Sequence, residues 1–165
     1  MFYPELAELP PILDFEASSF SDESYPISAG LIVSGKLYYW LIKPKQDWID
    51  WALPSQAIHG IKRSVLIEQG LQADQVFDEL MTALNGHECV YSDAPLWERL
   101  WMSRLGQTDK IIMEVKELIP NCTVDLFKLT LSKNFENHKL IRHKANHDAL
   151  AISITVRDLR LGAEI

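Results

Sequence analysis

Two acidic residues end the first apolar run of the chain, and their spacing constrains both the local fold and its chemistry. The run at residues 11–13 is followed by Asp14, Phe15 and Glu16. Side chains of a strand alternate between its two faces, so this spacing predicts both carboxylates on one face and Phe15 in the core. Like charges held this close repel each other unless a cation or a shared proton joins them. Oxygen ligands favour Mg²⁺ or Mn²⁺ over zinc, although such a pair is also typical of ordinary acids at a solvated strand end.

The composition is that of an ordinary globular protein. The chain has 165 residues, 47% hydrophobic and 24% charged, which predicts a single domain over residues 1–165 with a sizeable core. No apolar run approaches the length of a membrane span, and no secretory signal is visible at the N-terminus, so no membrane partner is expected. Cys89 and Cys122 are too few for a disulfide framework or a zinc cage. They indicate reduced, buried thiols and a cytoplasmic location.

The net charge of −7 excludes one broad class of partner. Proteins that bind long duplex nucleic acid by electrostatics need basic surface that displaces counterions. An acidic protein is better suited to short strands or strand ends. Bound divalent cations would supply positive charge where a phosphate must lie.

The hydrophobic pattern predicts three consecutive strands followed by alternating helices and strands. The expected strands are 11–16, 26–33, 37–42 and 88–92, and the expected helices are 73–85, 95–105 and 146 onward. The tryptophans near residues 48–53 suggest a short helix, whereas residues 109–132 are ambiguous between strand and helix. Three antiparallel strands followed by this alternation indicate an α/β fold with a mixed sheet.

Two further polar groups are placed where chemistry is common. Asp93 follows the strand at 88–92, and Glu98 lies about one turn into the next helix. Both also fit ordinary roles, as an N-cap and as an acid near the helix dipole. His143 precedes Asp148 by five residues at the start of the last helix. A histidine beside a metal-bound water suits a general base, because its ordinary pKa lies near neutrality; capping and lining the helix start is the alternative.

Together these groups resemble one family. Asp-x-Glu on a first strand, an acid after a later strand and His-x-Ala-x-x-Asp on a late helix resemble the pattern of the DEDDh 3′–5′ exonucleases, which include proofreading subunits, ribonuclease T and oligoribonuclease. The resemblance covers residues 11–158, and its most specific piece is His-Lys-Ala-Asn-His-Asp-Ala at 143–149. It implies a ribonuclease H-like fold, whose central mixed β-sheet of three antiparallel strands and then parallel strands is flanked by helices.

The resemblance also implies roles for single residues. Asp14 and Glu16 match the first motif, Asp148 matches the acid of the third motif, and His143 matches its general base. The second motif departs from the family pattern. Glu98 stands where members usually have aspartate, so we expect Glu98 to be its equivalent and keep Asp93 as the alternative metal ligand.

The implied activity is metal-dependent release of nucleoside 5′-monophosphates from 3′ ends of RNA or single-stranded DNA, with two ions of Mg²⁺ or Mn²⁺. The residues expected to contact the terminal nucleotide are Ala17, Ser18, Ser19, Phe20 and His59. A homodimer through the tryptophans near 48–51 is left open, as is a core role for them. The alternatives are a catalytically weakened or inactive nucleic-acid-binding module on the same fold, and an α/β domain with coincidental acids that acts on another phosphorylated molecule.

Overall fold

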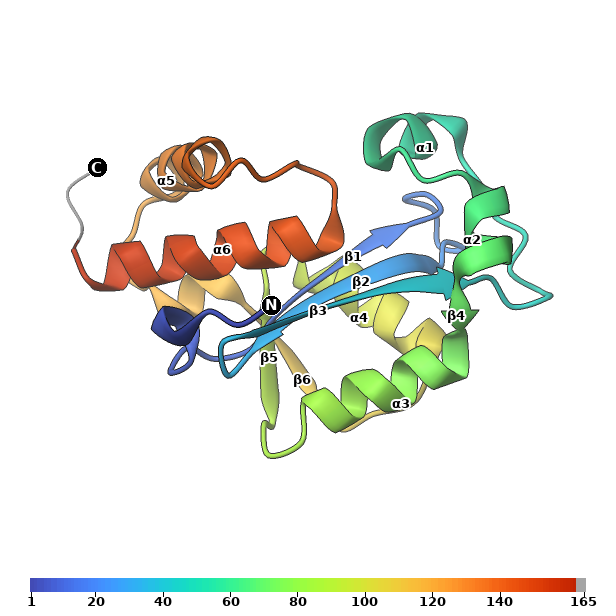
Figure 1. The fold of residues 1–165 in the computed structure, drawn as a ribbon, viewed down its shortest axis with the longest axis horizontal. Helices are drawn as coiled ribbons and strands as arrows, with labels where there is room; N and C mark the ends of the chain where they lie inside the picture. Colours follow the sequence, from blue (N-terminus) through green and yellow to red (C-terminus); the bar gives the residue numbers. More distant parts are fainter. Residues whose placement is uncertain (163–165) are drawn as a thin grey trace.

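The computed structural model of the protein describes residues 1–162, so Ala163–Ile165 of the expected domain lie outside it. Its centre is a mixed sheet of six strands in the order β4-β3-β2-β1-β5-β6 (Figure 1). The strands are β1 (Ile12–Ala17), β2 (Pro26–Val33), β3 (Lys36–Lys43), β4 (Leu71–Gln72), β5 (Cys89–Ser92) and β6 (Ile111–Glu114). The first three pair antiparallel, whereas β4, β5 and β6 join them in parallel. The predicted mixed α/β sheet is confirmed.

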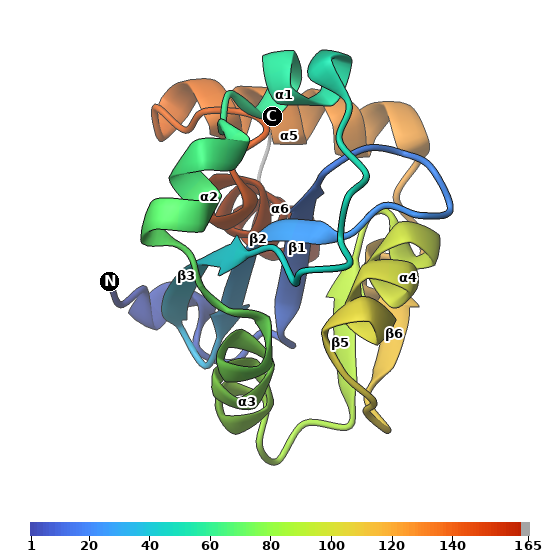
Figure 2. The same ribbon diagram turned by 90° about the vertical axis from the view of Figure 1, so that its right-hand side faces the viewer.

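Helices cover both faces of this sheet. They are α1 (Leu53–His59), α2 (Arg63–Gln69), α3 (Ala73–Ala83), α4 (Pro95–Leu105), α5 (Val124–Asn137) and α6 (Ala145–Arg160), with 3₁₀ turns at Pro4–Leu6 and Val115–Leu118. Helix α6 lies across β1 and β2 with α5 packed outside it, and α3 and α4 cover the opposite face (Figures 1 and 2). Helix α2 packs against β3, and α1 lies beyond the carboxyl end of β1 (Figure 1).

Strand β1 separates two hydrophobic cores. Leu13 and Phe15 are buried on the side of α3 and α4, whereas Ile12 is buried on the side of α6. Asp14 and Glu16 share the face of Ile12, as the alternation predicted. The two carboxylates therefore lie under α6, the helix that carries the third motif.

Gly30 of β2 sets the position of α6 against the sheet. It lies opposite Asp14 in the β1–β2 ladder. A Cβ added to Gly30 would overlap the backbone of Ala145 and Asn146, in the first turn of α6. The missing side chain therefore allows helix backbone to rest on strand backbone. This close approach brings the start of α6, and Asp148 with it, beside Asp14.

Several local expectations need correction. Helix α1 begins at Leu53, after the two tryptophans that were expected to form a short helix. Trp48 is instead buried and stacks on Tyr25 with the ring centroids 5.0 Å apart, which is the core role left open for it. Cys89 and Cys122 are free thiols as expected, but both are partly exposed rather than buried. None of the helices within residues 1–162 is long and apolar enough to span a bilayer.

Candidate active site

Three carboxylates from β1 and α6 meet in one cluster. One carboxylate oxygen from each of Asp14, Glu16 and Asp148 lies within 4.8 Å of the others, and each residue is partly buried. The Oδ2 atom of Asp148 accepts the Lys144 N–H at 2.8 Å, which orients the carboxyl group. A set of three hard oxygen donors that repel one another in the absence of a cation fits Mg²⁺ or Mn²⁺. The cluster can therefore hold divalent metal.

Burial and the nearness of the other acids raise the pKa of all three carboxyl groups in the absence of metal. Burial raises the pKa of Asp14 well above its ordinary value, and the charges of Glu98 and Asp148 raise it further. Burial and then Asp148 raise the pKa of Glu16 to about 8, with Lys144 opposing the shift. Burial also raises the pKa of Asp148 to about 6. A bound cation would reverse these effects, because it stabilises the charged carboxylates.

Between pH 6.5 and pH 8.5, we expect the metal-free protein to lose stability as the pH rises. The folded pKa of Glu16 is about 8, so across this range the folded state binds more protons than the unfolded state and its free energy of unfolding falls. Below pH 6.5, buried His59 makes the free energy of unfolding rise with pH, because its pKa in the folded state is lowered to about 4.

Urea unfolding in chelator at pH 6.5, 7.5 and 8.5 measures this loss. Glu16→Gln is the matched variant and should flatten the dependence, since it removes one of the titrating groups. Millimolar Mn²⁺ should flatten it in the wild type. A metal-free stability that stays constant or rises over this range contradicts the prediction.

Glu98 approaches the cluster from α4, on the other face of the sheet. Only 1% of its surface is exposed, and its Oε1 atom accepts the N–H of Phe15 at 3.2 Å. The parallel β1–β5 ladder contains the single pair Ile12–Tyr91, so β1 has left β5 before it reaches Phe15. The carboxylate of Glu98 fills the opening between them. Its Oε2 atom is buried and has no hydrogen-bond partner among residues 1–162, which leaves it available to a ligand.

Asp93 lies at the end of β5, at the edge of the site. It is not the N-cap of α4: that residue is Ala94, whose N–H is bound by the hydroxyl of Ser92 at 3.0 Å. Although Asp93 is exposed, the protein around its carboxyl group displaces enough water to raise its pKa. Its charge in turn raises the pKa of Asp14 and of Asp148. Neither Asp93 nor Glu98 belongs to the cluster of three, but both lie close enough to act on it.

His143 stands on the loop that leads into α6. Its side chain is exposed, and its backbone adopts a left-handed conformation with φ of +59°. That conformation is uncommon for a residue other than glycine, and such residues gather at functional sites. The next residue, Lys144, was missed by sequence reasoning. Its Nζ atom donates to the carbonyl oxygen of His59 at 3.0 Å and so ties the start of α6 to α1; the only signal was its place inside the third motif.

A small cavity of about 100 Å³ adjoins the cluster at the end of β1. Glu16 and His143 line it together with four of the five residues predicted to contact a nucleotide. Those four are Ala17, Ser19, Phe20 and His59. Ser18, the fifth, is not among its lining residues: it is buried, and its hydroxyl donates to Asp50 at 2.6 Å.

His59 and Phe20 give the small cavity its chemical character. Nδ1 of His59 accepts the Ile61 N–H at 3.0 Å, and the lowered pKa keeps the ring neutral, so the ring proton is on Nε2. That Nε2 is buried without a partner among residues 1–162. Phe20 is 65% exposed and packs edge-on against Trp97 of α4 at 5.3 Å. The cavity thus offers a free hydrogen-bond donor beside an aromatic rim.

Solved structures of exonucleases share this fold. Exonuclease I of E. coli in complex with a dA16 oligonucleotide superposes with a TM-score of 0.69 at 14% identity, covering 92% of this chain and 41% of that one. Exonuclease I from Methylocaldum szegediense gives 0.65 at 14% identity, covering 93% and 41%. Exonuclease X in complex with 5′ overhanging duplex DNA gives 0.64 at 13% identity, covering 94% and 93%.

At such identities the likeness establishes the fold, which is the ribonuclease H-like fold expected from the motifs. The chain spans about two-fifths of the length of the exonuclease I chains. No protein-family model matches the sequence. No curated protein matches it either.

Proposed function

We propose that this protein is a metal-dependent 3′–5′ exonuclease that releases nucleoside 5′-monophosphates from single-stranded DNA or RNA. The observation that carries the proposal is the carboxylate cluster of Asp14, Glu16 and Asp148, within 4.8 Å on a fold shared with exonucleases I and X. The small cavity at its side, about 100 Å³ and lined by His143 and His59, supports the proposal because part of a terminal nucleotide could enter it.

Each group has a role that its chemistry supports. Mg²⁺ or Mn²⁺ held by the three carboxylates would supply charge stabilisation and an activated water. His143 takes the proton of the attacking water, because histidine is the side chain that most often serves as a general base. His59 donates from Nε2 to the terminal nucleotide, and Phe20 stacks on its base. In-line attack at the last phosphodiester then releases a 5′-monophosphate.

The direct test is a degradation panel. Short single-stranded DNA, RNA and blunt duplex, each labelled in turn at the 5′ and the 3′ end, are incubated with Mg²⁺, Mn²⁺ or chelator. The proposal expects a labelled mononucleotide from 3′-labelled single strands, a shortening ladder from 5′-labelled ones, and neither in chelator. Absence of release from every substrate with both metals would show that the activity is not present.

A binding module without turnover is the second candidate. Glu98 favours it, because its Oε1 atom is committed to the backbone of Phe15 and the residue lies outside the cluster of three. This candidate expects oligonucleotide binding in the presence of Mn²⁺ with no release of mononucleotide. The degradation panel, with fluorescence anisotropy of the same labelled strands, separates the two.

We expect Glu98→Gln to reduce turnover at least about 10²-fold and Asp93→Asn to reduce it less than about tenfold. The charge of buried Glu98 raises the pKa of Asp14 more than the charge of exposed Asp93 does. Glutamine keeps an oxygen that can accept the Phe15 N–H, so the backbone contact survives. Initial rates on one 3′-labelled strand compare the two variants. The opposite ranking would assign the second-motif role to Asp93.

Replacing His143 should slow the reaction by about 10²- to 10⁴-fold, the usual contribution of a general base. His143→Asn is the sharper variant, because asparagine tolerates the left-handed backbone at this position while alanine does not. Mn²⁺ affinity, measured by calorimetry, should stay within about twofold. Lost metal binding would instead make His143 a ligand.

A further inference from the structure

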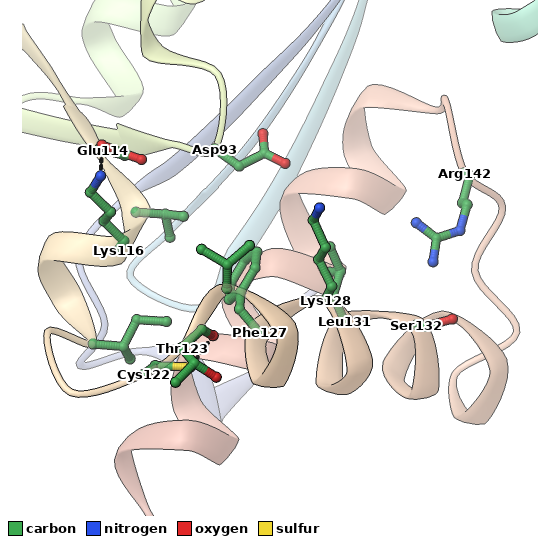
Figure 3. Close-up of a pocket in the computed structure, with 13 residues that line it drawn as sticks. Asp93, Glu114, Lys116, Cys122, Thr123, Phe127, Lys128, Leu131, Ser132 and Arg142 are labelled. Carbon is green, nitrogen blue, oxygen red and sulfur yellow. Dashed lines mark hydrogen bonds and ion pairs between the residues drawn. The ribbon is translucent and has the colours of Figure 1, made fainter.

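The loop that leads into α6 carries three consecutive basic residues, which contact three different parts of the protein. Arg142 lines a larger cavity of about 610 Å³ beside α5 and stacks on Phe135 of that helix at 4.3 Å (Figure 3). His143 lines the small cavity at the end of β1. Lys144 reaches α1, where its Nζ atom donates to the carbonyl oxygen of His59 at 3.0 Å. The loop is therefore held between α5 on one side and α1 on the other.

The backbone of Lys144 is fixed to the carboxylate cluster. Its N–H donates to Oδ2 of Asp148 at 2.8 Å, and its carbonyl oxygen accepts the Asp148 N–H at 2.9 Å. Burial lowers the pKa of His59, and the positive charge of Lys144 lowers it further. The same charge opposes the rise that burial causes in the pKa of Glu16. Lys144 thus lies within electrostatic reach of both the cluster and the end of α1.

Helix α1 depends on such outside contacts for its position. Ser55 and His59 are its buried residues, whereas Leu53 and Ile58 are exposed to solvent. A helix of two turns is not stable by itself in water. The carbonyl groups of its last turn have no partners inside the helix, and the negative end of the helix dipole favours a cation there. The ammonium group of Lys144 supplies both the donor and the charge.

His59 is held through its backbone and through its ring. The carbonyl oxygen accepts from Lys144, and Nδ1 accepts the Ile61 N–H at 3.0 Å. The ring of Trp51 packs edge-on against the imidazole at 6.0 Å. These contacts leave Nε2, which has no partner among residues 1–162, as the donor that His59 offers to the small cavity. A shift of the end of α1 would move this donor.

We propose that Lys144 is a positioning residue, which holds the end of α1 and the ring of His59 over the small cavity in a fixed place relative to the carboxylate cluster. The inference rests on the proposed exonuclease function and adds a residue to it. Because Lys144 joins α1 to the cluster through its side chain, a change there loosens the nucleotide contact and leaves the metal ligands in place. The role needs a cationic donor, which lysine and arginine both provide.

Amide hydrogen exchange in chelator tests the link without turnover. Lys144→Met removes the donor and keeps the apolar part of the side chain, Lys144→Arg keeps a donor, and Lys133→Met, at an exposed position on α5, is the control. Exchange in α1 should be at least about tenfold faster in Lys144→Met than in wild type, because a hydrogen bond to a charged group is lost, while exchange in α6 stays unchanged. Lys144→Arg should stay within about threefold of wild type, and Lys133→Met should match it.

Steady-state kinetics at saturating Mn²⁺ test the consequence for the reaction. In Lys144→Met, the KM for a 3′-labelled single strand should rise at least about threefold, because a smaller fraction of molecules holds α1 in place. The kcat should stay within about twofold of wild type, because the carboxylates and His143 do not move. Lys144→Arg should restore the KM.

The outcomes separate a positioning role from a structural one. Unchanged exchange in α1 overturns the proposal, as does an unchanged KM or a fall in kcat alone. Equal acceleration of exchange in α1 and α6, or failure of Lys144→Met to fold, would make Lys144 a residue of general stability and also overturn it. Faster exchange confined to α1, without nucleotide release by wild type, would keep the link between α1 and α6 and reject only the exonuclease function.

Discussion

Replacing Asp14 by asparagine should abolish nucleotide release and, at the same time, make the metal-free protein harder to unfold. The substitution keeps the size of the side chain and removes one charge from the centre of the cluster. Loss of a metal ligand removes several kcal/mol of transition-state stabilisation, so we expect a rate reduction of about 10³-fold or more. The gain in stability follows from the raised pKa of Asp14, because the folded protein holds that charge at a cost.

Two measurements check both halves of this prediction. Release of mononucleotide from a 3′-labelled strand in Mn²⁺ gives the activity, and urea unfolding in chelator at pH 8 gives the stability. Asp78→Asn, an exposed acid on α3, is the matched control and should leave both unchanged. If the Asp14→Asn protein keeps more than a tenth of wild-type activity, Asp14 is not a catalytic residue. An unfolding midpoint below that of wild type in chelator would mean that Asp14 stabilises the fold.

Gly30→Ala should destabilise the protein on the order of 3 kcal/mol and remove activity as well, because overpacking against backbone cannot be relieved by a rotamer change. The new methyl group would meet the backbone of Ala145, so α6 would have to move away from β2. Asp148 would move with the helix, and the cluster would open.

Gly86→Ala provides the comparison. A Cβ at Gly86 meets no atom within 4 Å, but its φ of +85° makes alanine cost about 1–2 kcal/mol. Urea unfolding of both variants in metal-free buffer measures the difference. If Gly30→Ala lowers the free energy of unfolding no more than Gly86→Ala does, α6 and β2 can move apart to accommodate the added methyl group at little cost.

Patterns that depend on neighbouring residues were readable from the sequence. The hairpin of β2 and β3, the helices after Ala73 and Pro95, and the alternation along β1 follow from local spacing and turn residues. The residues at 111–114 stayed ambiguous, because a short apolar run fits a strand or a helix equally well. The start of α1 was placed too early, since Trp48 pairs with Tyr25 through packing that no local pattern reveals.

The candidate site divides in the same way. Alternation along β1 predicted that Asp14 and Glu16 share a face, and the resemblance to the exonuclease motifs added Asp148; the structure brings the three together. The backbone bond of Glu98 and the larger cavity were not foreseen, because both depend on where β5 leaves β1 and how α5 packs. Lys144 was likewise invisible as a link to α1, since its partner lies 85 residues away.

The opening between β1 and β5 gives the glutamate at position 98 a physical explanation. From Phe15 onward β1 has no β5 neighbour, and the Glu98 carboxylate accepts the N–H that a strand would otherwise accept. The side chain thus serves as a one-residue extension of the sheet, and its length has to match the width of the gap from α4. An aspartate would be one methylene shorter and would leave that N–H without its acceptor. The length of this side chain therefore fits the shape of the sheet, and acids in such sites are best compared by where their carboxylates end.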